Sequence, residues 1–288
     1  MSSPLFRIRP RWPYVVAGMA GAVWGAGLSR TISQLTFSSF FFSWYGVLLC
    51  CAVCAVSAML ITLRTAPQPG TPLSGDFFLP LFLPLIDIFN PNAQSWRGPV
   101  LLLMGSALMV YLRVKPKVKV SVLLAVVVPL LVYMTDISPY VGRADTFEFQ
   151  VVAPQLGVAH PSGYPLYILI GKLFSMLPFG TIAWRVNLSS SVLSACAAGI
   201  MVLILLEISH LLPWSVEARY RRGAALLTAW VLAFSPTLWS RSIEAEVYAL
   251  NALLVTLVLW VSIMWVANRI SGKTALPLLG LLTGWAIA

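Results

Sequence analysis

Long apolar stretches determine what this chain can fold into. Residues 120–134 read VSVLLAVVVPLLVYM, with no charged side chain, and comparable stretches recur along the sequence. A helix of about 20 such residues is long enough to cross the hydrocarbon core of a bilayer. The alternation of apolar and polar residues that is typical of an outer-membrane barrel is absent. The sequence therefore predicts an all-α, polytopic membrane protein.

The apolar stretches and the basic residues together predict a topology. The predicted spans are 13–29, 43–63, 77–89, 98–112, 119–136, 185–207, 224–240, 247–267 and 275–288. The third is short and contains Pro80 and Pro84, so it could be re-entrant. If every span crosses, most lysines and arginines fall on one side, which the positive-inside rule assigns to the cytoplasm. The same bias accounts for the net charge of +10, so we expect no nucleic-acid partner.

A proline- and glycine-rich segment, TAPQPGTPLSGD at 65–76, indicates a linker. We expect residues 1–118 to form an N-terminal transmembrane helical extension and residues 119–288 to form the core. Within the extension, Gly21 and Gly25 form a GxxxG pattern that favours close helix packing. The last apolar stretch stops at the C-terminus without a flanking charge, so we expect a fragment of a longer protein.

Acidic residues are few and unevenly placed. Five of the nine lie on the predicted non-cytoplasmic side, in two segments. They are Asp136, Asp145, Glu148, Glu244 and Glu246. Acids contribute little to topology, so their clustering needs another cause. The segment RADTFEFQVVAPQLGVAHPSGYPLY at 143–167 contains two of them, and its polarity between apolar runs indicates a site at the outer membrane face.

Two features of this segment suggest chemistry. On a helix, the spacing of Asp145 and Glu148 places both carboxylates on one face, where one can act as a general base toward a hydroxyl group. Pro161, Gly163 and Pro165 favour a rigid turn that would bring His160 and Tyr164 to the carboxylates, ahead of an interfacial helix. For the carboxylates, the alternative is a solvated helix with two ordinary acids. For the prolines, the alternative is that they only end a helix.

Two arginines near predicted helix ends suit a phosphate group. Arg185 and Arg241 each present a planar fork of donors. At least one of Glu244 and Glu246 could pair with Arg241, and Glu246 could point inward. Single interfacial arginines also serve as membrane anchors. Among possible metal ligands, the cysteines at 50, 51 and 54 lie in an apolar run, so we expect no zinc site. The two carboxylates could hold a divalent cation without needing one.

The stretches that hold these residues resemble a known family. ADTFEFQVVAPQLGVAHPSGYPLYILIGKLFSMLPFGTIAWRVNLSSSVLSA and, further on, LAFSPTLWSRSIEAEVYALNALL are similar to the DUF2723 family, which includes protein O-mannosyltransferase-like members of the GT-C glycosyltransferase superfamily. The similarity covers roughly residues 119–270. Many relatives read GDSGE where this chain reads RADTFE, which leaves the division of roles between Asp145 and Glu148 open.

The resemblance implies a GT-C-like core with a long outer loop that carries interfacial helices. It implies a membrane glycosyltransferase that uses a polyprenyl-phosphate-linked sugar donor and an acceptor hydroxyl on a protein, glycan or lipid. Asp145 matches the family's catalytic acid, Glu148 is the next carboxylate, and His160, Tyr164, Arg185, Arg241 and Glu246 are the expected substrate-binding residues. We expect a multi-pass plasma-membrane protein with its site on the non-cytoplasmic side. A transporter or flippase, or a catalytically inactive structural protein, are the alternatives.

Overall fold

The computed structural model describes residues 12–36, 38–65, 80–81, 83–84, 97–114, 117–212 and 216–287. The secondary structure in these ranges is helical, which confirms the all-α prediction. The chain divides into two compact units, with the division between residues 115 and 116. Unit 1 contains α1 (Trp12–Thr36), α2 (Ser39–Phe42), α3 (Trp44–Thr65) and α5 (Arg97–Val114).

In unit 1, α1 packs closely against α3 along the GxxxG pattern. A Cβ atom added at Gly21 would lie 2.5 Å from the carbonyl oxygen of Cys54, and one added at Gly25 would collide with the backbone of Cys50. The two glycines therefore permit a backbone approach that any larger residue would prevent. The close packing predicted from the pattern is confirmed.

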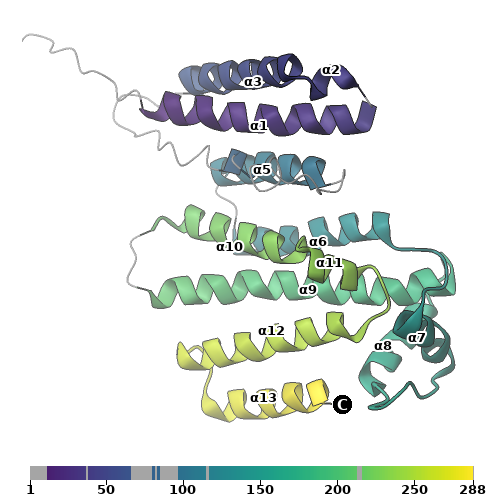
Figure 1. The fold of residues 1–288 in the computed structure, drawn as a ribbon. Helices are drawn as coiled ribbons and strands as arrows, with labels where there is room; N and C mark the ends of the chain where they lie inside the picture. Colours follow the sequence, from purple (N-terminus) through teal and green to yellow (C-terminus); the bar gives the residue numbers. More distant parts are fainter. Residues whose placement is uncertain are drawn as a thin grey trace, which may run out of the picture. The chain divides into compact units, whose positions relative to one another are not determined.

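Unit 2 is built around one long helix, α9. The unit contains α6 (Val118–Asp136), α7 (Ala144–Gln155), α8 (Pro165–Ser175), α9 (Ile182–Leu211), α10 (Ala218–Ala233), α11 (Pro236–Ser242), α12 (Val247–Val266) and α13 (Gly272–Ile287). Figure 1 shows α6, α10 and α12 running beside α9, with α13 beyond α12 and α7 and α8 gathered at one end. Small residues such as Ser194, Ala197 and Ala198 are buried along α9, which lets several neighbours approach it closely.

Four helices in the described part of the chain are long and apolar enough to cross a membrane. They are α3, α6, α9 and α12, and they match four of the predicted spans. The described helices at 13–29, 98–112 and 275–288 do not meet this criterion, and the predicted span 77–89 lies mostly outside the described residues. The side of the membrane on which each loop lies therefore depends on how many of the helices that do not meet this criterion also cross the bilayer.

The predicted single span 224–240 is wrong as an uninterrupted helix. The structure breaks it into α10 and α11, bent by 66°. Pro236 is the cause, because proline disfavours a helical conformation at the residue before it and begins a helix well. The hydroxyl of Tyr133 donates a 2.6 Å hydrogen bond to the carbonyl of Ala233, the last residue of α10. Counted as one broken span, the pair is a fifth candidate to cross.

The two ends of unit 2 differ in charge. At one end, the loops after α6 and after α8 meet, since Thr181 Oγ1 donates to the carbonyl of Pro139 at 2.6 Å. The α11–α12 junction lies at this end as well, where the carbonyl of Ser242 accepts a 2.6 Å hydrogen bond from Ser191. The acidic segments gather there, and we call it the carboxylate end. At the opposite end Arg269 and Arg221 contact the last part of α9, and we call it the basic end.

We expect the basic end to face the cytoplasm, because the positive-inside rule applies to such loops. In a variant with Cys50, Cys51, Cys54 and Cys196 replaced by alanine, a cysteine at position 160 should react with a membrane-impermeant maleimide in intact cells. A cysteine at position 117, which is exposed at the basic end, should react only after permeabilisation. The reverse pattern would overturn the orientation.

Candidate active site

Helix α7 carries the two carboxylates at the carboxylate end. Asp145 lies in its first turn, where a negative charge is favoured by the helix dipole. The helix continues through Pro154 and ends at Gln155. Leu156 caps it in a left-handed conformation, and Gly157 N donates to the carbonyl of Val152 at 3.1 Å. Asp145 and Glu148 thus lie three residues apart on one helical face, as predicted from their spacing.

The turn after α7 brings His160 back onto Glu148. The backbone N–H of His160 donates to Glu148 Oε1 at 2.7 Å, and His160 Nδ1 lies 2.6 Å from Glu148 Oε2. The turn closes through a 2.7 Å hydrogen bond from Gly163 N to the carbonyl of His160, with Gly163 at φ +92°. Tyr164 follows, also at positive φ, and Pro165 begins α8. The proline- and glycine-rich turn therefore places His160 as the sequence predicted.

The contact between Glu148 and His160 is an ion pair when the imidazole is protonated. The hydrogen bond from the imidazole lowers the pKa of the Glu148 carboxyl, and the backbone N–H of His160 lowers it further. The same hydrogen bond raises the pKa of His160, and the charges of Glu148 and Asp145 add to that rise. Each group favours the charged form of the other.

Asp145 is the carboxylate that remains open to solvent. Its side chain is exposed and has no hydrogen bond or ion pair with the described residues. One ligand atom each from Asp145, Glu148 and His160 lie within 4.8 Å of one another. Such spacing and such donors fit a divalent cation. A cation there would compete with the hydrogen bond that already joins Glu148 to His160.

A second charged pair lies at the α11–α12 junction. Arg241 Nη1 donates to Glu246 Oε1 at 3.1 Å, and the guanidinium lies over the ring of Tyr248, 5.0 Å from its centroid. Glu246 is buried, which raises the pKa of its carboxyl. The Arg241 guanidinium opposes that rise, and the charges of Asp145 and Glu244 add to it. The structure thus selects Glu246, and not Glu244, as the partner of Arg241, with a half-exposed guanidinium beside a buried acid.

Arg185 is placed differently from Arg241. Its guanidinium donates hydrogen bonds to the carbonyl oxygens of Ser175, Phe179 and Gly180, at 2.8 to 3.1 Å. These bonds hold the loop between α8 and α9. Lys172 of α8 donates to the carbonyl of Pro154 near the end of α7 at 2.6 Å. Both cations thus fasten α8 to its neighbours.

Sequence reasoning missed a buried polar layer beneath the carboxylates. Gln150 Nε2 donates to Asn187 Oδ1 at 2.8 Å, and Gln150 Oε1 accepts from Gly142 N at 2.8 Å. On the same helix, Ser190 lies 2.8 Å from the hydroxyl of Tyr167 and bonds the backbone of Glu246. The signal was present in the sequence as Asn187 and three consecutive serines inside an apolar helix.

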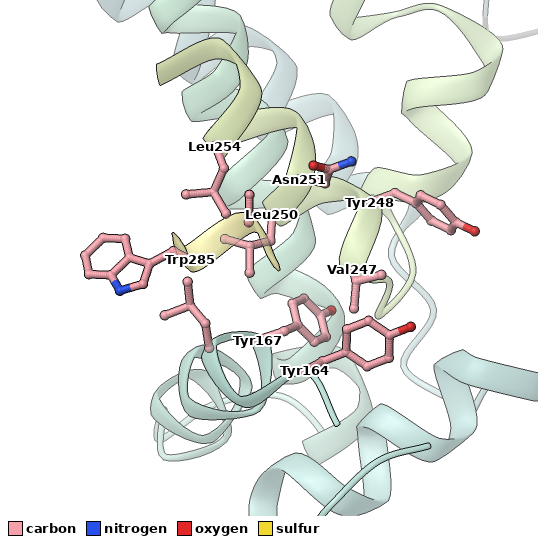
Figure 2. A pocket seen from close by; sticks show the side chains of 10 residues that line it. Tyr164, Tyr167, Val247, Tyr248, Leu250, Asn251, Leu254 and Trp285 are labelled. Carbon is pink, nitrogen blue, oxygen red and sulfur yellow. The ribbon is translucent and has the colours of Figure 1, made fainter. Parts of the chain in front are cut away.

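An apolar pocket adjoins the charged groups. It has a volume of about 220 Å³ and lies between α8, α12 and α13. Figure 2 shows Tyr164 and Tyr167 on one side and Val247 and Leu250 on the other. Tyr164 also contacts the imidazole of His160, with ring centroids 5.1 Å apart, and Tyr248 lines the pocket beneath Arg241. The pocket therefore links both charged pairs to an apolar space.

The sequence profile of the protein O-mannosyl-transferase TMEM260 N-terminal domain matches residues 145–288, which is half of the chain. The chain belongs to this family. All seven predicted site residues fall within the match. The match begins and ends later in the chain than residues 119–270, over which the sequence resemblance was expected. The O-mannosyltransferase-like assignment is confirmed at this level.

The chain is also similar to two curated proteins that carry the TMEM260 name. Protein O-mannosyl-transferase tmem260 of Dictyostelium discoideum is 31% identical over 144 residues, which cover 49% of this chain and 16% of the relative. Protein O-mannosyl-transferase TMEM260 of Mus musculus is 37% identical over 116 residues, which cover 40% and 15%. The match thus spans about a sixth of each relative's length. No solved structure matches the chain significantly.

The Glu148–His160 pair predicts a pH-dependent stability. A histidine whose folded pKa is raised stabilises the fold fully below its ordinary pKa and loses that contribution as the pH rises through the raised value. The difference in melting temperature between the unsubstituted chain and Glu148→Gln should therefore shrink from about pH 6 to about pH 9. Thermal unfolding in detergent measures it.

His160→Gln provides the control for this pH series, because it removes the titrating group. Adding Glu148→Gln to His160→Gln should change the melting temperature by the same amount across that range. The difference in melting temperature between the unsubstituted chain and Glu148→Gln could instead stay constant with pH. That result would show that no protonated histidine takes part in the contact.

Proposed function

We propose that this chain forms the donor and acceptor site of a membrane glycosyltransferase. In this proposal it moves mannose from a polyprenyl-phosphate carrier to a protein hydroxyl at the non-cytoplasmic membrane face, in a GT-C-like core. The names of the curated relatives support the sugar and the acceptor class. The observation that carries the proposal is the open carboxylate of Asp145 beside an ion pair and an apolar pocket.

Asp145 is the proposed general base. Its carboxylate is exposed and makes no hydrogen bond within the described residues, so it can accept a proton from an acceptor hydroxyl. The deprotonated oxygen then attacks the anomeric carbon of the sugar while the bond to the lipid phosphate breaks. Glu148 is less suited to this step, because both of its oxygens already bond His160. We assign Glu148 and His160 to holding the loop and orienting the acceptor.

Arg241 is the proposed contact for the leaving phosphate. A guanidinium has five N–H donors, and the hydrogen bond to Glu246 uses one nitrogen, Nη1. Burial of Glu246 and the stacking on Tyr248 fix the direction of the guanidinium. A preorganised cation stabilises the charge that grows on the phosphate as it leaves. Arg185 is the weaker candidate because backbone carbonyls occupy its donors.

The apolar pocket is the proposed place for the first part of the polyprenyl chain. Tyr167, Leu250 and Leu254 line it and are buried, so a hydrocarbon segment would contact apolar side chains there. Its volume of about 220 Å³ holds only part of a donor. Exposed apolar residues on α8, such as Leu169 and Leu173, support an interfacial position for this helix, where the remaining chain would enter the bilayer.

A transporter is a poorer description of these residues. In a proton or ion relay, acids lie within membrane-spanning segments. Asp145 and Glu148 lie on α7, which is too short to span a membrane, and Glu246 precedes α12. An inactive structural role is separated from catalysis by the variants below.

Asp145→Asn should abolish most of the transfer activity. The change keeps the size of the side chain and removes its basic oxygen, and loss of a general base typically lowers a rate by about 10² to 10⁴, or about 3–5 kcal/mol of barrier. Turnover of a polyprenyl-phosphate-mannose donor is measured with expression checked alongside. Glu148→Gln should be milder. Near-normal turnover in Asp145→Asn would remove this residue from the mechanism, and loss in Glu148→Gln alone would make Glu148 the base.

Arg241→Gln should weaken donor binding about tenfold, since a charge-assisted contact to phosphate is lost. Binding of a short-chain polyprenyl-phosphate donor to the purified chain measures this without requiring turnover. The control is Lys273→Gln, which removes the same charge from an exposed residue where α13 begins, at the basic end. Equal weakening by both substitutions would mean that Arg241 is a membrane anchor.

A further inference from the structure

The basic end of unit 2 contains a second, larger cavity, far along α9 from the carboxylates. Its volume is about 420 Å³, within the range of small-ligand sites. The residues that line it come from α6, α9, α10 and α12. The charged and polar ones are Glu207, His210, Arg221 and Arg222, and the apolar ones include Leu203, Leu206, Trp260 and Met264. The cavity is therefore basic on one side and apolar on the other.

The cationic side has the features of a phosphate site. Arg221 Nη1 donates to His210 Nδ1 at 3.0 Å, which fixes the guanidinium, while Arg221 Nε is buried without a hydrogen-bond partner in the described structure. A buried donor without a partner is costly, and an anion would satisfy it. Arg222 Nε bonds the carbonyl of Ala218 at 3.0 Å. Both guanidiniums lie near the N-terminus of α10, where the helix dipole also favours an anion.

The only acid among the lining residues is already compensated. Glu207 Oε1 accepts a 2.7 Å hydrogen bond from Arg269 Nε, and the Glu207 side chain is largely buried in this contact. Among the lining residues, the two arginines therefore outnumber the one acid in formal charge. Arg219, on the same helix, is paired with Glu217 at 2.9 Å and does not line the cavity.

We propose that this cavity binds the phosphate and adjoining glycerol of an anionic phospholipid from the membrane leaflet at the basic end. The two arginines would hold the phosphate, and the apolar residues of α9 and α12 would contact the first carbons of the acyl chains. Basic pockets between transmembrane helices are a known form of lipid headgroup site. A soluble phosphate compound would use the arginines but would gain nothing from Trp260 and Met264. The charge and the apolar side together favour a lipid.

Binding of water-soluble short-chain lipids to the purified chain tests the proposal. Dihexanoyl-phosphatidylglycerol should bind more tightly than dihexanoyl-phosphatidylcholine, and inorganic phosphate at the same concentration should compete poorly. Each arginine near a lipid headgroup contributes about 1 kcal/mol, so Arg221→Gln with Arg222→Gln should weaken phosphatidylglycerol binding about 30-fold. The matched control, Arg219→Gln, removes one charge from the same helix outside the cavity and should change it less than about twofold.

Two results of the binding experiments would overturn this assignment. Equal weakening in the control and in Arg221→Gln would show that the arginines act only as a general basic surface. Competition by inorganic phosphate as strong as that by phosphatidylglycerol would show a soluble-phosphate site. A photoreactive phosphatidylglycerol gives a test that does not depend on the variants folding: crosslinks to α9, α10 and α12 at the cavity support the proposal, and crosslinks confined to other segments contradict it.

Discussion

Hydrogen bonds from buried polar side chains in the first turns of α9 hold the carboxylate end together. Asn187 bonds Gln150 of α7, Ser190 bonds Tyr167 of α8 and the backbone of Glu246, and Ser191 bonds the carbonyl of Ser242 at the end of α11. Each bond is made where water is excluded, so an unsatisfied partner would be costly. Small serine side chains also let the neighbouring backbones come close. The positions of the short helices therefore depend on α9.

This arrangement explains how short elements can build a precise site. Helices of the length of α7 and α8 are only marginally stable alone in water. Here Phe149 and Tyr167 are buried in the core at this end, and Lys172 and Arg185 tie the ends of α7 and α8 to the adjoining backbone. Asp145 stays exposed on a firmly held helix. A carboxylate that is rigidly placed and still accessible is what a general base requires.

The two ends of unit 2 use arginine in different ways. At the carboxylate end, Arg241 is oriented by a buried acid and an aromatic ring, which suits a contact that strengthens as charge develops. At the basic end, Arg221 is oriented by a histidine beside an apolar wall, which suits a ligand that stays bound. Arg185 is the weaker candidate for a phosphate contact, because its donors are used by the chain itself.

The sequence by itself determined the helical class, the close packing at Gly21 and Gly25, and the grouping of Asp145, Glu148 and His160. These features follow from local periodicity, glycine spacing and a proline-rich turn, and each acts over a few residues. Sequence reasoning could not separate Arg185 from Arg241, because both are single arginines near helix ends. It also missed the bend before Pro236 and the cavity around Arg221. Only the tertiary structure decided these, because the partners of each guanidinium lie 5 to 11 residues away, across a loop or helix junction whose fold directs them toward the arginine or away from it.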